Sequence, residues 1–189
     1  MTLIYSFVVG ALSWTLCEYL LHRFIGHSKK SQRGFAQEHR AHHSAGDYFM
    51  PLLKKLRVSL QVLAPLTLVS IYLLGSAVGS GFALGFTVFF LIYEIVHKRA
   101  HTHPPRNSYG RWLRRHHFFH HFSAPRKNFG VTTPLWDWVF RTYTPAGLIR
   151  LPAKKAMVWL IDPQTDEVLP QFASDYQIRS VKNYRNKAS

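Results

Sequence analysis

The chain has 189 residues and a mass of 21.9 kDa, which suits one domain with its own core. Charged residues make up 17% and hydrophobic residues 47%, a composition that excludes a disordered chain. The one cysteine, Cys17, excludes an internal disulfide and a cysteine-ligated cluster. The net charge of +15 suggests contact with an anionic membrane. Nucleic acid is not an expected partner, because the basic residues flank apolar stretches rather than forming one stripe.

The apolar stretches predict three membrane-spanning helices. From Met1 to His22 the only charged residue is Glu18, and this length is enough to cross a bilayer. Residues 58–93 contain no Asp, Glu, Lys or Arg. A single helix of that length would measure about 54 Å, so two antiparallel spans with a turn at 75–81 are expected. Pro65 is expected to kink the first of the two.

Basic residues predict how these spans are oriented. They cluster between the first and second spans and again at Lys98 and Arg99, whereas the turn at 75–81 has no charge. The positive-inside rule therefore places the N-terminus outside and the histidine-rich face in the cytoplasm. The predicted fold class is all-α: an integral membrane protein with about three spans and a cytoplasmic, helical, histidine-rich cap. The alternative, a soluble protein with buried helices, does not account for the long uncharged run.

Ten of the twelve histidines fall into four spaced groups, which we call boxes. The boxes are His22 and His27; His39, His42 and His43; His97 and His101; and His117, His120 and His121. Residues i, i+3 and i+4 share a helix face, so each H-x2-H-H box is expected to direct three imidazoles to one point. The H-x4-H pair does not share a face in a straight α-helix, but a loosened helix end where the span leaves the membrane could bring both rings inward.

The number of histidines predicts two metal ions. One tetrahedral zinc uses about four ligands, whereas ten imidazoles suit two metals with several nitrogens each. Imidazole binds Fe, Zn, Cu and Ni, so the ligands alone do not identify the metal. Histidines at a membrane interface without a metal are the simpler interpretation of any one box, but not of four.

Two carboxylates are placed close to these boxes. Glu18 precedes His22 by four residues, and Glu94 precedes His97 by three. A carboxylate behind a ligating imidazole fixes its tautomer, so both are predicted to support ligands in this way. The alternative is that they form ion pairs with Arg23 or Arg99.

Four segments carry a resemblance to the fatty acid hydroxylase superfamily, which includes fatty acid 2-hydroxylases, sterol desaturases and carotenoid hydroxylases. They are WTLCEYLLHRFIGH (Trp14 to His27), HRAHH (His39 to His43), YEIVHKRAH (Tyr93 to His101) and the run from His116 to Thr142. The resemblance covers roughly residues 10 to 143. It implies that the ten box histidines bind two iron ions, with zinc compatible in a purified protein.

The resemblance also implies an activity: a membrane-bound oxygenase that uses molecular oxygen to hydroxylate a long acyl chain or acyl lipid. Sterol or carotenoid desaturation or hydroxylation is an alternative within the superfamily, and a non-catalytic metal-binding membrane protein is another. No cytochrome b5-like domain precedes the boxes, so a separate cytochrome b5-like or ferredoxin-like electron donor is expected. The family usually has four spans, so a homo-oligomer could supply a missing wall of the substrate tunnel. Residues 1–145 are predicted to form the hydroxylase-like domain and 146–189 a cytoplasmic extension of unknown role.

Overall fold

Three long helices dominate the computed structural model, which describes residues 1–28, 30 and 33–179. They are α1 (Thr2–Leu20), which continues as the π-helix η1 (Leu21–Gly26), α3 (Leu52–Leu74) and α4 (Ser76–Thr102). Within the described residues, these three are long and apolar enough to cross a membrane, which confirms the predicted number. The turn between α3 and α4 is shorter than expected: it is Gly75 alone, at φ 79°.

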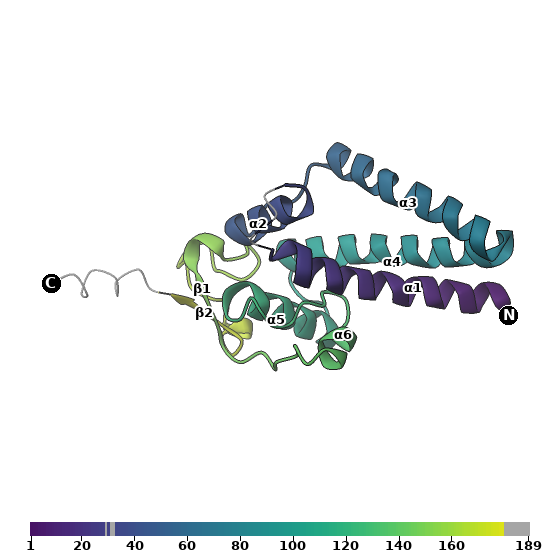
Figure 1. The fold of residues 1–189 in the computed structure, drawn as a ribbon. Helices are drawn as coiled ribbons and strands as arrows, with labels where there is room; N and C mark the ends of the chain where they lie inside the picture. Colours follow the sequence, from purple (N-terminus) through teal and green to yellow (C-terminus); the bar gives the residue numbers. More distant parts are fainter. Residues whose placement is uncertain (29, 31–32, 180–189) are drawn as a thin grey trace.

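The helices α1 and α4 lie side by side along their length (Figure 1). Glycines permit this close approach. A Cβ at Gly85 would lie 2.0 Å from the Phe7 carbonyl oxygen, and one at Gly10 would lie 2.0 Å from the Phe82 carbonyl oxygen. Small residues let membrane helices bring their backbones together in this way. By contrast, α3 diverges from α4 towards the histidine-rich end (Figure 1).

Gly85→Ala is expected to destabilise the protein by about 3 kcal/mol, the upper end of the cost of overpacking, because the clash is with backbone that cannot rotate away. Thermal unfolding in detergent measures this. Gly147→Ala is the matched control, since a Cβ at Gly147 meets no atom within 4 Å. Equal melting temperatures for the two variants would show that α1 and α4 do not depend on this contact.

A helical cap lies at the end of the spans away from the N-terminus (Figure 1). It comprises α2 (Phe35–Ala45), α5 (Ser108–Phe122) and α6 (Leu135–Val139). The start of α5 is fixed by Asn107, whose side chain accepts a 2.7 Å hydrogen bond from the Gly110 amide. Three of the four boxes lie on α2, α4 and α5, and the fourth lies on η1 and the residue after it.

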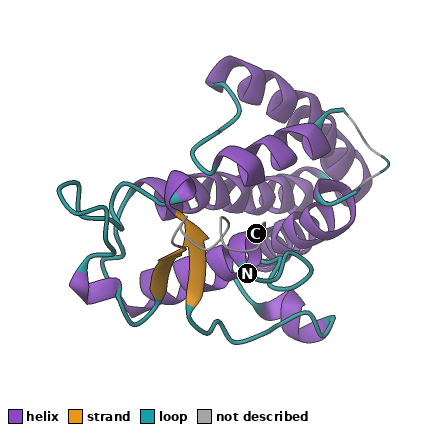
Figure 2. Cartoon of the chain, turned by 90° about the vertical axis from the view of Figure 1, so that its left-hand side faces the viewer, coloured by secondary structure: helices purple, strands orange, loops and turns teal. Residues whose placement is uncertain are grey.

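The cap also contains a small sheet, which the sequence did not predict. Strands β1 (Ile149–Pro152) and β2 (Tyr176–Arg179) pair in parallel (Figure 2). Ile149 and Leu151 are fully buried, and they pack in one cluster with Phe118 of α5. Four-residue strands are too short to show a convincing alternation in sequence. The protein is mostly helical, as expected, with this sheet added.

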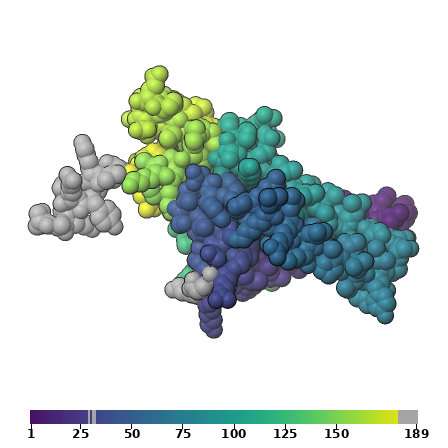
Figure 3. Space-filling model, turned by 90° about the horizontal axis from the view of Figure 1, so that it is seen from above, coloured from purple at the N-terminus to yellow at the C-terminus, as the bar shows by residue number. Residues whose placement is uncertain are grey.

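Residues 146–179 gather at the end of the molecule opposite the N-terminus, against α5 (Figure 3). The Trp159 indole donates to the carbonyls of Ala100 and His101 at the end of α4, at 3.2 and 3.1 Å. Asp175 pairs with Arg111 and Arg115 of α5. This segment therefore packs against α4 and α5, the helices that carry two of the four boxes. Its definition as a separate extension stays a prediction, and residues 180–189 lie outside the described residues.

Candidate metal centre

The structure gathers all ten box histidines into two groups of five. Group one contains His22, His27, His39, His43 and His120. Group two contains His42, His97, His101, His117 and His121. Within each group, one ring nitrogen from every residue lies within 4.8 Å of the others. Each group could therefore hold one metal ion.

The H-x2-H-H boxes divide between the two groups, so the expectation that each directs three rings to one point is wrong. His39 and His43 enter group one while His42 enters group two. On α5 the division is reversed: His117 and His121 enter group two, and His120 enters group one. Neighbouring residues on a helix project about 100° apart, whereas i and i+4 stack on one face. Each group consequently depends on both α2 and α5.

The H-x4-H pair reaches group one because the helix end loosens, as expected. Residues 21–26 form a π-helix, whose i→i+5 hydrogen bonds bring residues five apart into alignment. The Nε2 atoms of His22 and His27 lie 3.0 and 2.9 Å from Nε2 of His120. π-Helical turns are frequent at functional sites, and this one puts two ligand candidates on one side.

The ring nitrogens of both groups fit a metal ion. In group two, Nε2 of His97 lies 3.0 Å from Nε2 of His42. The Nε2 atoms of His101 and His117 are 2.9 Å apart. Both nitrogens of His121 are buried and have no hydrogen-bond partner among the described residues. Buried polar atoms normally have a partner. A cation at the point where the lone pairs converge would supply one.

Backbone carbonyls fix the tautomer of several rings. Nδ1 of His22 donates to the Phe129 carbonyl oxygen at 2.5 Å. Nδ1 of His120 donates to the Lys127 carbonyl oxygen at 2.7 Å, and Nδ1 of His42 to that of Tyr48 at 2.9 Å. Each ring therefore keeps its Nε2 lone pair free for a metal.

Burial also favours the neutral form of the rings. Outside the spans, it lowers the pKa of the box histidines on α2 and α5, and neighbouring imidazoles lower the pKa of most of them further. Neutral imidazole is the form that binds metals.

The two carboxylates have partners other than the expected ones. Glu18 accepts hydrogen bonds from the amides of Val131 and Thr132, at 2.6 and 3.3 Å, and from the Thr132 hydroxyl at 3.0 Å. Glu94 pairs with Lys55. Among the described residues neither carboxylate hydrogen-bonds to a histidine, and the Phe129 carbonyl occupies Nδ1 of His22. The alternative partner Arg23 instead donates to the Tyr19 hydroxyl.

Asp137 is a supporting residue that the sequence analysis missed. Its side chain is fully buried and accepts from the amides of Phe129 and Gly130 at 2.9 and 2.8 Å. It also lies 3.2 Å from Nε2 of His116, which is outside both groups. Asp137 thus holds the loop whose Phe129 carbonyl orients His22. The signal available in the sequence was that Asp137 is the one charged residue in the stretch 128–140.

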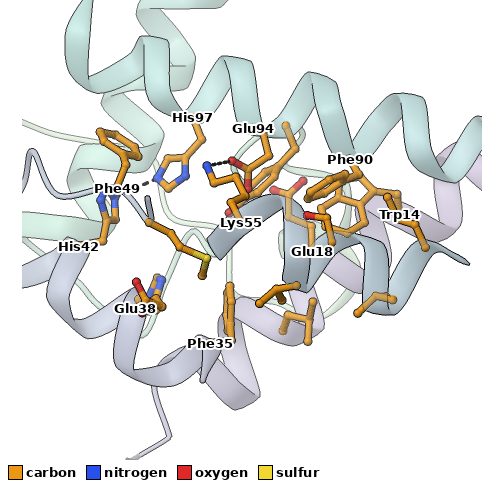
Figure 4. Close-up of a pocket in the computed structure, with 18 of the residues that line it drawn as sticks. Trp14, Glu18, Phe35, Glu38, His42, Phe49, Lys55, Phe90, Glu94 and His97 are labelled. Atoms are coloured by element: carbon orange, nitrogen blue, oxygen red, sulfur yellow. Dashed lines mark hydrogen bonds and ion pairs between the residues drawn. The ribbon is translucent and has the colours of Figure 1, made fainter. Parts of the chain in front are cut away.

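A cavity of about 300 Å³ adjoins the two groups, between α1, α2, α3 and α4. His39, His42 and His97 are among its lining residues, and Figure 4 shows His42 and His97 at one end. Trp14 and Phe90 lie at the other end in Figure 4, with the Lys55–Glu94 pair between the two ends. Most of the remaining lining is apolar. The cavity is therefore shaped for an apolar ligand whose polar end faces the histidines.

Comparison with known proteins identifies the family. The family model for fatty acid hydroxylase matches residues 7–142. Human fatty acid 2-hydroxylase is 33% identical over 151 residues, which covers 74% of this chain and 39% of the human protein. The dihydroceramide fatty acyl 2-hydroxylase FAH2 of Arabidopsis thaliana is 32% identical over 151 residues, covering 78% of this chain and 62% of that protein.

A solved structure, full-length scs7p with only the hydroxylase domain visible, aligns with a TM-score of 0.59 and 27% identity. The alignment covers 75% of this chain and 56% of that one. The chain thus spans less than two thirds of each of these three proteins. The family model covers all four histidine boxes. On this evidence the chain belongs to the fatty acid hydroxylase family.

Proposed function

We propose that this chain is a membrane-bound di-iron oxygenase that hydroxylates a long acyl chain or acyl lipid with molecular oxygen. The observation that carries the proposal is the pair of five-histidine groups at the polar end of an apolar cavity between membrane helices. The names of the relatives, fatty acid 2-hydroxylase and dihydroceramide fatty acyl 2-hydroxylase, support carbon 2 as the position oxidised.

The chain's own residues bind and orient, and the bound iron supplies the oxygen chemistry that no side-chain acid or base can perform. Group one and group two would each hold one ion. The carbonyls of Phe129, Lys127 and Tyr48 keep three rings in the ligating tautomer. The apolar cavity walls hold the acyl chain and exclude water. Zinc would fill the same nitrogen sites but has no redox chemistry.

We also propose the arrangement in the membrane and the partners of the enzyme. Basic residues that flank the spans support a cytoplasmic histidine-rich face and an N-terminus outside. A separate cytochrome b5-like or ferredoxin-like protein would deliver electrons on the cytoplasmic side. A homo-oligomer stays a prediction, which the mass of the detergent-solubilised particle tests.

The proposal predicts two metal ions per folded chain and oxygen-dependent hydroxylation. Protein made in iron-rich medium is assayed for metal content, and then for lipid products by mass spectrometry with oxygen and a reductant. A folded preparation with one metal or none would contradict the two-metal site. Oxidation of a sterol or carotenoid ring alone would favour the alternative branch of the superfamily. Two metals without oxygen consumption with any lipid would favour a non-catalytic metal-binding protein.

A further inference from the structure

The short helix α6 presents an apolar surface that the rest of the described chain leaves exposed. Leu135, Trp138 and Val139 are 37%, 58% and 56% exposed. Their spacing of i, i+3 and i+4 puts them on one face of the helix. Phe140, the next residue, is 42% exposed. We call these four residues the α6 patch. Large apolar side chains exposed together mark a surface that binds a partner or a membrane.

Another side of α6 packs against the membrane-spanning helix α1, near the cap (Figure 1). The Trp136 indole donates to the Thr15 hydroxyl at 2.9 Å. The Phe140 ring stacks on Tyr19, with the ring centroids 5.2 Å apart. Arg23 is the first basic residue of the chain. Thr15 and Tyr19 precede it by eight and four residues, which is about 12 and 6 Å along an α-helix. Helix α6 therefore lies at a depth where α1 is still within its apolar span.

The charge around the α6 patch favours a lipid surface over a second protein chain. Arg23 donates to the Tyr19 hydroxyl, and the exposed Arg141 directly follows the patch. Between residues 95 and 161 the one acidic residue is Asp137, which is fully buried. Two copies that met through this patch would bring arginines together without a carboxylate to pair with them. An anionic membrane surface supplies the opposite charge.

The same helix holds the loop beside group one. Asp137 of α6 accepts from the amides of Phe129 and Gly130, and the Phe129 carbonyl orients His22. A helix of five residues is too short to be stable without contacts to its surroundings. Contact on the outer face of α6 therefore contributes to the position of Asp137 and of the loop that it binds.

We propose that the α6 patch inserts into the interface of the membrane leaflet at the histidine-rich end, and that this contact holds the loop at Phe129 and Gly130 in place. Apolar segments of this kind lie about 5–10 Å into the boundary between headgroups and acyl chains, a level at which Trp is enriched. Helix α6 is thus a membrane contact in addition to the three spans. The lipid packs against its outer face as α1 packs against another.

A spin label at position 139 tests the insertion. Because Cys17 is the one cysteine, Val139→Cys in a Cys17→Ala background is labelled at a single site. The zinc-loaded protein is reconstituted in vesicles of phosphatidylcholine and phosphatidylglycerol. Collision rates with oxygen, which concentrates in hydrocarbon, and with a water-soluble nickel chelate report the depth of the label. We expect it about 5–10 Å below the lipid phosphates.

Val158→Cys in the same background is the matched control. Val158 is 89% exposed and lies in the segment 146–179, at the end of the molecule opposite the N-terminus. Its label is expected to collide with the nickel chelate more often than with oxygen.

Hydrogen exchange in the same vesicles tests the link to the loop. Val139→Glu places a carboxylate in the patch, and a charge at this depth displaces α6 from the membrane. The amides of Phe129 and Gly130 should then exchange at least about 10-fold faster, because their acceptor on α6 moves away. Val158→Glu puts the same charge on an exposed valine outside the patch and should leave this exchange unchanged. Mass spectrometry of the peptides that contain the two amides measures the rates.

Three results would overturn the inference. A label at 139 that meets the nickel chelate as often as the label at 158 would show that the patch faces water. A label shielded from both reagents, with spin–spin broadening that disappears on dilution with unlabelled chain, would show that a second copy covers the patch. Unchanged amide exchange in Val139→Glu would refute the link to the loop. Neither measurement depends on turnover, so absence of hydroxylation would contradict the proposed function alone.

Discussion

Replacing His120 with alanine is expected to lower the metal content from two ions to one per chain and to abolish hydroxylation. His120 is fully buried, and its Nε2 lies 3.0 and 2.9 Å from Nε2 of His22 and His27. It is the one contribution of α5 to group one. A removed ligand cannot be replaced inside a packed site, whereas group two keeps all five of its histidines. Metal analysis of the purified variant measures the change.

Two comparisons show whether the loss is specific to group one. The double variant His120→Ala/His121→Ala removes one ligand from each group and should lose both metals. His103→Ala should keep both, since His103 is exposed and lies outside the two groups. Loss of both metals from His120→Ala alone, in a folded protein, would show that the two groups do not bind independently.

Replacing Asp137 with asparagine is expected to weaken metal binding in group one by about 10- to 100-fold, the range seen when a residue behind a metal ligand is lost. Asp137 accepts from the amides of Phe129 and Gly130 and from the Thr142 hydroxyl. An asparagine presents an NH2 group to one of these donors, so a buried amide or hydroxyl loses its acceptor. The loop then shifts and moves the Phe129 carbonyl away from Nδ1 of His22.

Competition with a chelator measures the effect of Asp137→Asn on each metal. The expected result is a selective loss from group one, with group two retained. Asp166→Asn is the matched control, because Asp166 is exposed in a turn at φ 56°, a backbone conformation that asparagine also adopts. Equal loss from both groups would indicate general unfolding rather than displacement of one loop.

The spans and the set of site candidates could be predicted because their signals are local. Hydropathy and charge along the chain are enough to identify three spans, since a bilayer requires a minimum apolar length and excludes charge. The spacing of the boxes identified the same ten histidines that the structure gathers. The spacing of His22 and His27 also indicated that a loosened helix end could bring both rings inward, because residues five apart do not share a face in a straight α-helix.

The assignment of histidines to particular groups needed the tertiary structure. Sequence shows that His39, His42 and His43 lie near one another on a helix. It does not show that His42 meets His97 of α4 while His43 joins His27 in the other group. That depends on how two helices distant in sequence are oriented, which no local pattern encodes.

The hydrogen-bond and ion-pair partners of Glu18, Glu94 and Asp137 also depend on the tertiary structure. Glu18 contacts a loop more than a hundred residues away, so its spacing from His22 was misleading. The sequence by itself determined which residues are ligand candidates and that they lie at a membrane face. Only the packing of α1, α2, α4 and α5 decided how they divide into two sites, because convergence of side chains in space depends on contacts between segments far apart in the chain.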